Sequence, residues 1–413
     1  MAQYKFEGDF ESLNEPQLEF VNKVVEKQGL KAKRVIFNTV GKAGDNFVGN
    51  VKRITIEGED GSMKMIVKIA ATDEMARHTT NHEVTFRNEH IMYTEVLPKF
   101  VQLQKAAGIP EKDLFRFAKC YGSFNEPPNE VIILEDLNES QFSMLDKFES
   151  LSNECVRKVL KDLAVYHSLS FVLKKQEPKK YEEFKKKLTD GWNVVFSNPL
   201  MNNHWKLLEA DTVKVLGDKH KHLIENKLIK MFKGRAQLVA SGSQRHNVIQ
   251  QGDAWTNNIM FKMEGDSIQS IMIDYQFATD GNPTLDLLYI IFNCTDHETR
   301  SKHYPSWIDH YYSELDKSLS NFGLKAAIVY PRNQMDADIK KYAQFMFYHC
   351  ILFATLLMRD PTEATEILES FKKAHLDDAT ATLKSENLQS ATVGRIKGRI
   401  EGVIASYEQF GLF

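Results

Sequence analysis

The chain has 413 residues, a formal net charge of −3, 42% hydrophobic residues and 26% charged residues. This length allows two or more lobes with their own hydrophobic cores, and the composition is that of an ordinary globular protein. Because the charge balance shows no basic excess, we expect no nucleic-acid partner.

Four cysteines are scattered along the chain without a C-x-x-C pair or the spacing of a zinc site. This pattern favours reduced thiols in a cytoplasmic protein. The N-terminus lacks the basic start and apolar block of a signal peptide. The most apolar stretch, residues 345–358, is shorter than the roughly 20 residues of a membrane-spanning helix, so we expect a buried core helix and no membrane span.

The N-terminal third predicts a small sheet with helices beside it. Residues 13–29 have helical spacing, with Asn14 as the N-cap. Three strand-like segments follow, separated by turn residues: 34–40, 51–57 and 63–70. A helical stretch at 81–97 is interrupted at Pro98, and a further strand covers 130–137.

Beyond about residue 140 the pattern is mostly helical, and residues 154–173 carry apolar side chains at helical spacing. A loop at 249–261 and a strand at 268–274 interrupt it. We therefore predict an α+β chain of two lobes. The smaller N-terminal lobe, residues 1–137, would hold an antiparallel sheet, and the larger lobe, residues 138–413, would be mainly helical.

The loop "IQQGDAWTNNIMF" (249–261) lies between two short apolar runs. Glycine and asparagine permit tight turns, so an ordinary hairpin would explain it. The alternative is a catalytic loop, with Asp253 as a base and Asn258, five residues later, as a magnesium ligand. Because such short patterns recur by chance, this loop alone does not distinguish a hairpin turn from a catalytic loop, and other segments of the chain are needed.

Three glycines, Gly41, Gly44 and Gly49, lie in a turn between two predicted strands. Without Cβ atoms, the backbone N–H groups of such a turn can approach phosphate oxygens. A strand follows, so the turn is neither a Walker loop nor a dinucleotide fingerprint. An ordinary hairpin is again the alternative.

A lysine and a glutamate follow in the order of a kinase. Lys68 lies late in an apolar strand, as does the lysine that pairs with nucleotide phosphates in kinases, and Glu89 lies in the next helix. Each has a competitor: Lys64 lies on the same face of the strand, and Glu83 lies in the same helix. Without the other motifs, Lys68 and Glu89 would each be interpreted as an ordinary solvated side chain.

Asp274 ends the strand "IMID", 21 residues after Asp253. This is the position of the metal-binding aspartate that follows the catalytic loop in kinases. A carboxylate on a buried strand is costly without a cation or a donor beside it. Glycine turn, strand lysine, helix glutamate, catalytic loop and strand-end aspartate thus occur in the order that a kinase-like phosphotransferase requires.

The chain resembles the ecdysteroid kinase-like family, which is related to choline kinases and aminoglycoside phosphotransferases. The family pattern H-G-D-x-W-x-x-N-x-M-F matches "QGDAWTNNIMF" except at Gln251. Six other segments resemble family motifs: "GKAGDNFVG", "FRNEHIMYTEVLP", "VIILEDL", "LAVYHSLS", "IDYQ" and "NPTLDLLYI". Together these matches run from about residue 35 to 295.

The resemblance implies a protein-kinase-like fold and a set of site roles. Asp253 would be the base, Asn258 and Asp274 would hold magnesium, and Lys68 with Glu89 would position the phosphates of ATP. The other positions implied are Gly41, Gly44 and Asn46 at the nucleotide, Glu135 and Leu137 at adenine through their backbone, and Asp286 as a brace of the catalytic loop. His167 would pack in the core or orient nearby groups.

The resemblance further implies an ATP- and magnesium-dependent kinase acting on a hydroxylated small molecule, with steroid-like compounds favoured. A choline- or aminoglycoside-type kinase is one alternative, and its cationic substrate would want an acidic, aromatic pocket. A non-catalytic kinase-like binding protein is another, although Lys68, Asp253, Asn258 and Asp274 are all present. Gln251 replaces the family histidine, and its amide N–H groups can keep the donated hydrogen bond, so we expect an active enzyme.

Overall fold

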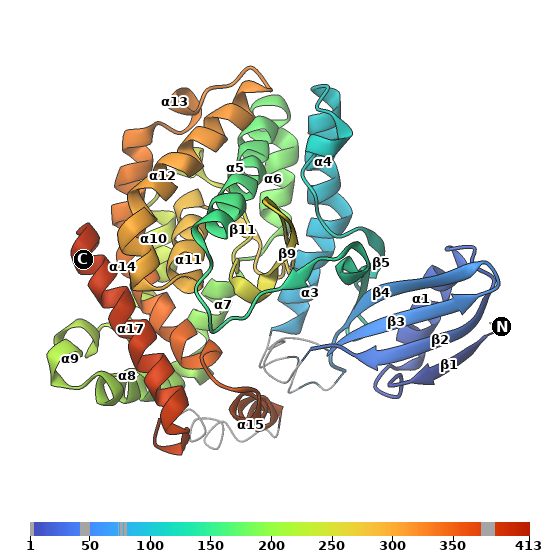
Figure 1. The fold of residues 1–413 in the computed structure, drawn as a ribbon, viewed down its shortest axis with the longest axis horizontal. Helices are drawn as coiled ribbons and strands as arrows, with labels where there is room; N and C mark the ends of the chain where they lie inside the picture. The colour runs from blue at the N-terminus through green and yellow to red at the C-terminus, as the bar shows by residue number, and fades with distance from the viewer. Residues whose placement is uncertain (1–3, 42–49, 73, 75–76, 78–80, 373–384) are drawn as a thin grey trace.

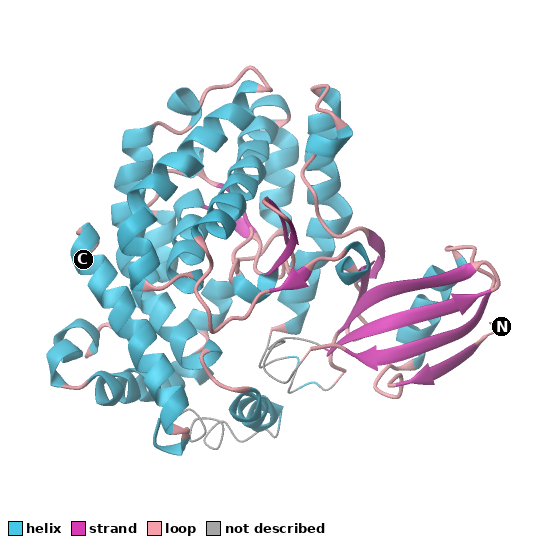
Figure 2. Ribbon diagram, viewed as in Figure 1, coloured by secondary structure: helices cyan, strands magenta, loops and turns pink. Residues whose placement is uncertain are grey.

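The structure is a computed structural model and describes residues 4–41, 50–72, 74, 77, 81–372 and 385–413. The strands of the N-terminal part form a sheet, and a larger, mainly helical part lies beside it (Figures 1 and 2). The α+β class and the two-part organisation predicted from the sequence are confirmed.

The N-terminal sheet has six strands in the order β1-β2-β3-β4-β6-β5. The three predicted strands and the fourth at 130–137 are all present, while β1 and β5 were not anticipated. Edge strand β1 pairs parallel to β2, and the remaining pairs are antiparallel. The strands are Lys5–Gly8 (β1), Ala32–Thr39 (β2), Asn50–Gly58 (β3), Gly61–Ile69 (β4), Cys120–Phe124 (β5) and Val131–Glu135 (β6).

One face of this sheet is covered by α1 (Glu15–Glu26), which begins with the predicted cap: the Asn14 side chain accepts the N–H of Gln17, and the Gln17 side chain accepts the N–H of Asn14. Apolar side chains of α1 form a core with alternate residues of the strands, Val67 and Ile69 of β4 among them. Because side chains alternate along a strand, Lys68 points to the opposite face. That face is turned toward the helix that lies between β4 and β5 in the sequence.

This helix is longer than predicted and does not stop at Pro98. It begins as α3 (His82–Ile91), passes through a π-helical turn, η1 (Met92–Val96), and continues as α4 (Leu97–Ala106). In the π turn the N–H of Leu97 bonds to the carbonyl of Met92, five residues back. The wider turn directly before Pro98 accommodates a residue that has no N–H and whose ring would clash in a regular helix.

The helical part packs around α5 and α11 (Figure 1). Its described helices are Asn153–Gln176 (α5), Pro178–Lys187 (α6), Gly191–Ser197 (α7), Asn202–Leu216 (α8), Asp218–Ile224 (α9), Leu228–Ala240 (α10), Pro283–Cys294 (α11), His297–Ser320 (α12), Ala326–Val329 (α13), Arg332–Leu357 (α14), Pro361–Lys372 (α15) and Ser390–Phe410 (α17). The apolar stretch 345–358 is the buried second half of α14. Of the helices that the structure describes, none is both long and apolar enough to cross a membrane.

Two small sheets carry the segments that the sequence singled out. One contains β7 (Ser143–Met144), β9 (Ile259–Glu264) and β10 (Ser267–Met272), and the other pairs β8 (Val248–Gln250) with β11 (Thr279–Gly281). The strands that flank the loop 251–258 therefore belong to different sheets. The loop is a connection between sheets and not the turn of a hairpin.

Candidate active site

Lys68, Glu89 and Asp274 meet although they are far apart in the sequence. The Nζ atom of Lys68 lies 2.5 Å from Oε2 of Glu89 and 2.8 Å from Oδ1 of Asp274. The Lys68 side chain is 10% exposed and that of Glu89 is 2% exposed. The N-terminal sheet, the helix α3 and the segment after β10 are thereby joined through one ammonium group.

The charge of Lys68 is stabilised by its two carboxylate partners. Burial alone would lower the pKa of Lys68, but Asp274 and Glu89 outweigh it and raise this pKa above its usual range. Burial raises the pKa of the Glu89 carboxyl, and the ammonium of Lys68 opposes that shift. Lys68 is therefore a cation at neutral pH, held beside two acidic groups.

Lys64 and Glu83, the alternatives to Lys68 and Glu89 in the sequence, lie outside this cluster. Lys64 forms an ion pair of 2.9 Å with Glu139, and both of these side chains are at least 40% exposed. Glu83 is exposed near the start of α3. The structure thus brings Lys68 and Glu89 together, and it leaves Lys64 and Glu83 at the surface.

The loop before β9 is built around Asp253, which is 6% exposed. Its Oδ2 accepts a hydrogen bond from the Nδ2 of Asn258 at 3.0 Å, and its Oδ1 accepts one from the Tyr289 hydroxyl at 2.5 Å. The same Nδ2 of Asn258 also bonds to the backbone carbonyl of Asp253 at 2.9 Å. Burial raises the pKa of the Asp253 carboxyl well above its usual value, while the hydrogen bond from Tyr289 opposes the shift.

Glycine is required at position 252. Gly252 has a φ of +83°, and a Cβ atom placed there would lie 2.2 Å from the carbonyl oxygen of Phe277. Any other residue would be strained in this conformation and would also collide with that backbone. The close approach draws the loop against the segment that follows Asp274.

Gln251 provides the donated hydrogen bonds expected of the residue in this position. Its Nε2 lies 2.9 Å from the carbonyl oxygens of both Ile273 and Asp274. Its Oε1 accepts the N–H of Asp253 at 2.7 Å. One buried amide thus connects the loop of Asp253 to the strand end of Asp274, and Asp274 itself adopts a left-handed backbone with a φ of +60°.

Asp286 holds the loop backbone from the first turn of α11. Its two oxygens accept the N–H groups of Gln251 at 2.8 Å and of Gly252 at 2.9 Å. His167, which is fully buried, lies with Nε2 3.1 Å from Asp286 and Nδ1 2.8 Å from the hydroxyl of Tyr311. These contacts are those expected of a loop brace and of a histidine that orients it.

Tyr289 was not among the site residues predicted from the sequence, although it belongs to the segment 282–290 that carries part of the family resemblance. The available signal was spacing, because Tyr289 and Asp286 are three residues apart on one helix and therefore face the same side. The sequence did not show that this face of α11 meets the loop 251–258.

The positions predicted to contact the nucleotide are described only in part. Gly41 is exposed and has a φ of +87°, whereas Gly44 and Asn46 fall outside the described residues. The Glu135 carboxylate accepts hydrogen bonds from Arg116 and from the backbone N–H of Lys119. Leu137 begins the short helix η3 (Leu137–Ser140), and its side chain is buried.

The oxygen donors at the site suit magnesium. Asn258 and Asp274 contribute an amide and a carboxylate, and the carbonyl of Asn258 accepts the N–H of Ile273 at 2.9 Å, which links the two segments. Over the described ranges, no group of three or more His, Cys, Asp or Glu side chains could hold a metal ion. A magnesium ion here would therefore need further oxygen ligands, such as the phosphates that it commonly shares in kinases.

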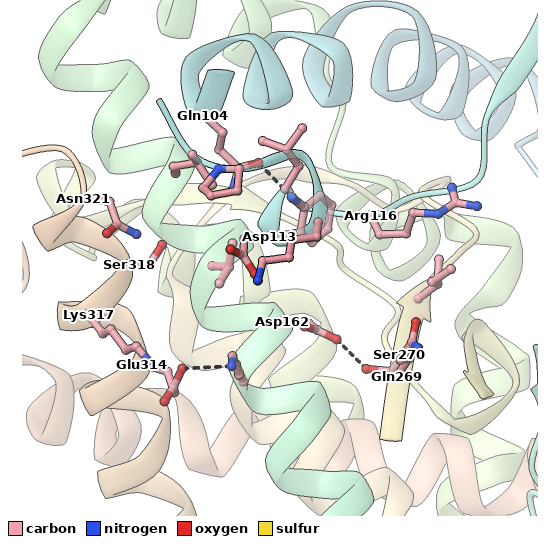
Figure 3. Close-up of a pocket in the computed structure, with 18 of the residues that line it drawn as sticks. Gln104, Asp113, Arg116, Asp162, Gln269, Ser270, Glu314, Lys317, Ser318 and Asn321 are labelled. Atoms are coloured by element: carbon pink, nitrogen blue, oxygen red, sulfur yellow. Dashed lines mark hydrogen bonds and ion pairs between the residues drawn. The ribbon is translucent and has the colours of Figure 1, made fainter. Parts of the chain in front are cut away.

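A cavity of about 910 Å³ lies apart from this site, between the loop 107–116, α5, β10 and the end of α12 (Figure 3). Polar groups in its wall bond to one another, such as Ser270 with Asp162 and Lys161 with Glu314. None of the described candidate site residues lines it. We therefore do not assign the cavity to the candidate active site.

The model of the ecdysteroid kinase-like family matches residues 43–324. No curated protein matches significantly. Solved structures with a similar chain path include a Plasmodium vivax ethanolamine kinase, with 15% identity, a TM-score of 0.41 and coverage of 87% of this chain and 83% of that one.

Two others are a mutant of an aminoglycoside 2'-phosphotransferase in complex with GDP (11% identity, TM-score 0.43, 95% and 98% of the two chains) and a microcompartment-associated aminopropanol kinase (11%, 0.45, 95% and 99%). The family model covers well over half of the chain, and it includes the loop 251–258, the Lys68–Glu89 pair and Asp274. This chain therefore belongs to the ecdysteroid kinase-like family.

Proposed function

We propose that this protein is an ATP- and magnesium-dependent kinase that transfers the γ-phosphoryl group to a hydroxyl of an ecdysteroid-like or other secondary-metabolite substrate. Membership of the ecdysteroid kinase-like family supports a small-molecule kinase. The observation that carries the proposal is the convergence of Lys68, Asp274 and the Asp253–Asn258 loop on one buried site.

The proposed roles follow from the chemistry of each group. Asp253 would accept the hydroxyl proton while the acceptor oxygen bonds to the γ-phosphorus and the bond to the β–γ bridging oxygen breaks. Lys68, oriented by Glu89, would hold phosphate oxygens. Asn258 and Asp274 would hold magnesium, which supplies charge neutralisation of the phosphates when bound.

The nucleotide would be enclosed by the remaining predicted contacts. Gly41, Gly44 and Asn46 would approach its phosphates, and the backbone of Glu135 and Leu137 would meet adenine. We place the boundary between the two lobes at Leu137, so that residues 1–137 and 138–413 would face each other across the nucleotide. A cytoplasmic location stays a prediction, supported by four cysteines that are all free thiols.

An apolar acceptor is favoured over a cationic one by the side chains near the loop. The half-buried Trp192 donates from Nε1 to the carbonyl of Gly252 at 2.7 Å and stacks on Phe277 with ring centroids 4.2 Å apart. The nearby carboxylate of Asp190 is paired with Arg235. Aromatic side chains suit either class of substrate, so the preference rests on Asp190: because Arg235 neutralises its charge, this carboxylate offers little attraction to a cation such as choline.

The test is a substrate screen with purified protein and magnesium-ATP. Ecdysteroids, hydroxylated plant toxins, choline and an aminoglycoside would be compared by ADP release, and products would be identified by mass spectrometry. We expect a monophosphate ester of a steroid-like polyol. Turnover of choline alone would contradict the substrate class, and ligand binding without any phosphorylated product would instead identify a non-catalytic binding protein.

A further inference from the structure

The carboxylate of Asp253 is held on both sides by hydrogen-bond donors. Asn258, from the same loop, bonds to Oδ2, while Tyr289, from helix α11, donates its hydroxyl to Oδ1 at 2.5 Å. Tyr289 is 2% exposed. These two hydrogen bonds reach different oxygens of one buried carboxyl group and thereby set the plane of that group.

Tyr289 is itself fixed by its surroundings. Its ring contacts His349 and Phe353 of α14, with centroid distances of 5.0 and 5.1 Å. α11 is buried along almost its whole length, so neither the helix nor the ring has room to turn. The hydroxyl is therefore presented to Asp253 from a rigid element.

The same face of α11 also holds the backbone of the loop. Asp286, three residues before Tyr289, accepts the N–H groups of Gln251 and Gly252. The helix thus provides one side chain for the loop backbone and a second for the carboxylate. A carboxylate oxygen has two lone-pair sites, so each oxygen of Asp253 keeps acceptor capacity for a further donor.

We propose that Tyr289 is a positioning residue of the phosphotransfer reaction, which orients the Asp253 carboxylate so that its remaining lone pairs face the acceptor hydroxyl. The inference rests on the proposed function. Loss of the hydroxyl would leave Asp253 in the site but with its carboxylate held by Asn258 alone. Because a base must lie within hydrogen-bond reach of the proton that it takes, misorientation lowers turnover more than binding.

The test compares Tyr289→Phe with the wild type under magnesium-ATP and the best acceptor from the screen. We expect kcat to fall about ten- to a hundredfold, with KM for both substrates changed less than about threefold. Tyr407→Phe is the matched control. It removes a hydroxyl that is equally buried and that donates to the carbonyl of Ala343 at 2.8 Å, and it should leave kcat unchanged.

A double-mutant cycle with Asp253→Asn tests whether Tyr289 acts through Asp253. If it does, adding Tyr289→Phe to Asp253→Asn costs little further activity. Full additivity of the two losses, or an unchanged kcat in Tyr289→Phe, would overturn the inference while leaving the kinase assignment intact. An inactive wild type would instead remove the proposed function, and this role with it.

Discussion

The side-chain amide of Gln251 donates a hydrogen bond of 2.9 Å to the backbone carbonyl of Asp274. Since the same side chain accepts the N–H of Asp253 at 2.7 Å, one residue sets the separation of the proposed base and the proposed metal ligand. Histidine can also donate from its ring, so the geometry does not depend on glutamine as such.

We expect Gln251→His to change kcat less than about threefold, because a donor to the Asp274 carbonyl is retained. Gln251→Leu, of similar size but without donors, should lower kcat at least about tenfold, since two buried carbonyls lose their partner. Steady-state kinetics of both variants measures this. Strong activation by histidine of an otherwise inactive protein would mean that Gln251 marks a silenced kinase.

Asp253→Asn should lower kcat by roughly 10²–10⁴, the usual contribution of a positioned base. The amide keeps the size and shape of the carboxylate, so the affinity for magnesium-ATP should be nearly retained. Calorimetric titration beside single-turnover kinetics separates the two. A variant with wild-type turnover would remove Asp253 from the role of base.

Lys68→Met should lower turnover about 10²–10³-fold, because it removes the cation that would stabilise phosphate charge. Lys64→Met is the matched control on the same strand face. Its ammonium pairs with Glu139 at the surface, so activity should persist. Circular dichroism would establish that both variants fold, and loss of activity in the Lys64 variant alone would reverse the choice of lysine.

Asn258→Ala and Asp274→Ala should each weaken magnesium-ATP binding at least about tenfold, since each removes an oxygen ligand. Asp266→Asn removes an acidic charge from the exposed turn between β9 and β10 and serves as the control. Titrations at several magnesium concentrations would measure the effect. Unchanged affinity in both alanine variants would argue against the proposed metal site.

Burial lowers the pKa of His204 from 6.5 to about 4, and Arg359 adds to the shift. The unfolded chain therefore binds a proton below about pH 6.5 that the folded chain does not bind until about pH 4. The free energy of unfolding therefore keeps its full value above pH 6.5, and protonation of His204 in the unfolded chain lowers it as the pH falls, by up to about 3 kcal/mol near pH 4.

Urea unfolding at pH 7.5 and 5.0 tests this, with His204→Gln expected to reduce the difference in unfolding free energy between the two pH values. His222→Gln is the control because His222 is exposed. An equal pH dependence in the wild type and the His204 variant would contradict the assignment to His204.

Features that depend on neighbouring residues could be predicted from the sequence. The cap at Asn14, the strands around Lys68 and the helix α5 follow from local periodicity and end signals, because each is formed within one short segment. The succession of strand-like and helical segments predicted the α+β class, and the residues of the motifs predicted the family. Residue type and spacing are sufficient where a motif is contiguous.

Contacts between residues far apart in the sequence became visible in the folded chain. The tertiary structure joined Lys68 to Asp274 across 206 positions, paired β8 with β11 instead of β9, and placed the Tyr289 hydroxyl on Asp253. The helix that passes Pro98 likewise depends on a π turn that no local signal announced. Such contacts arise from the packing of whole elements against one another, and the spacing of residues along one segment carries no information about its partner.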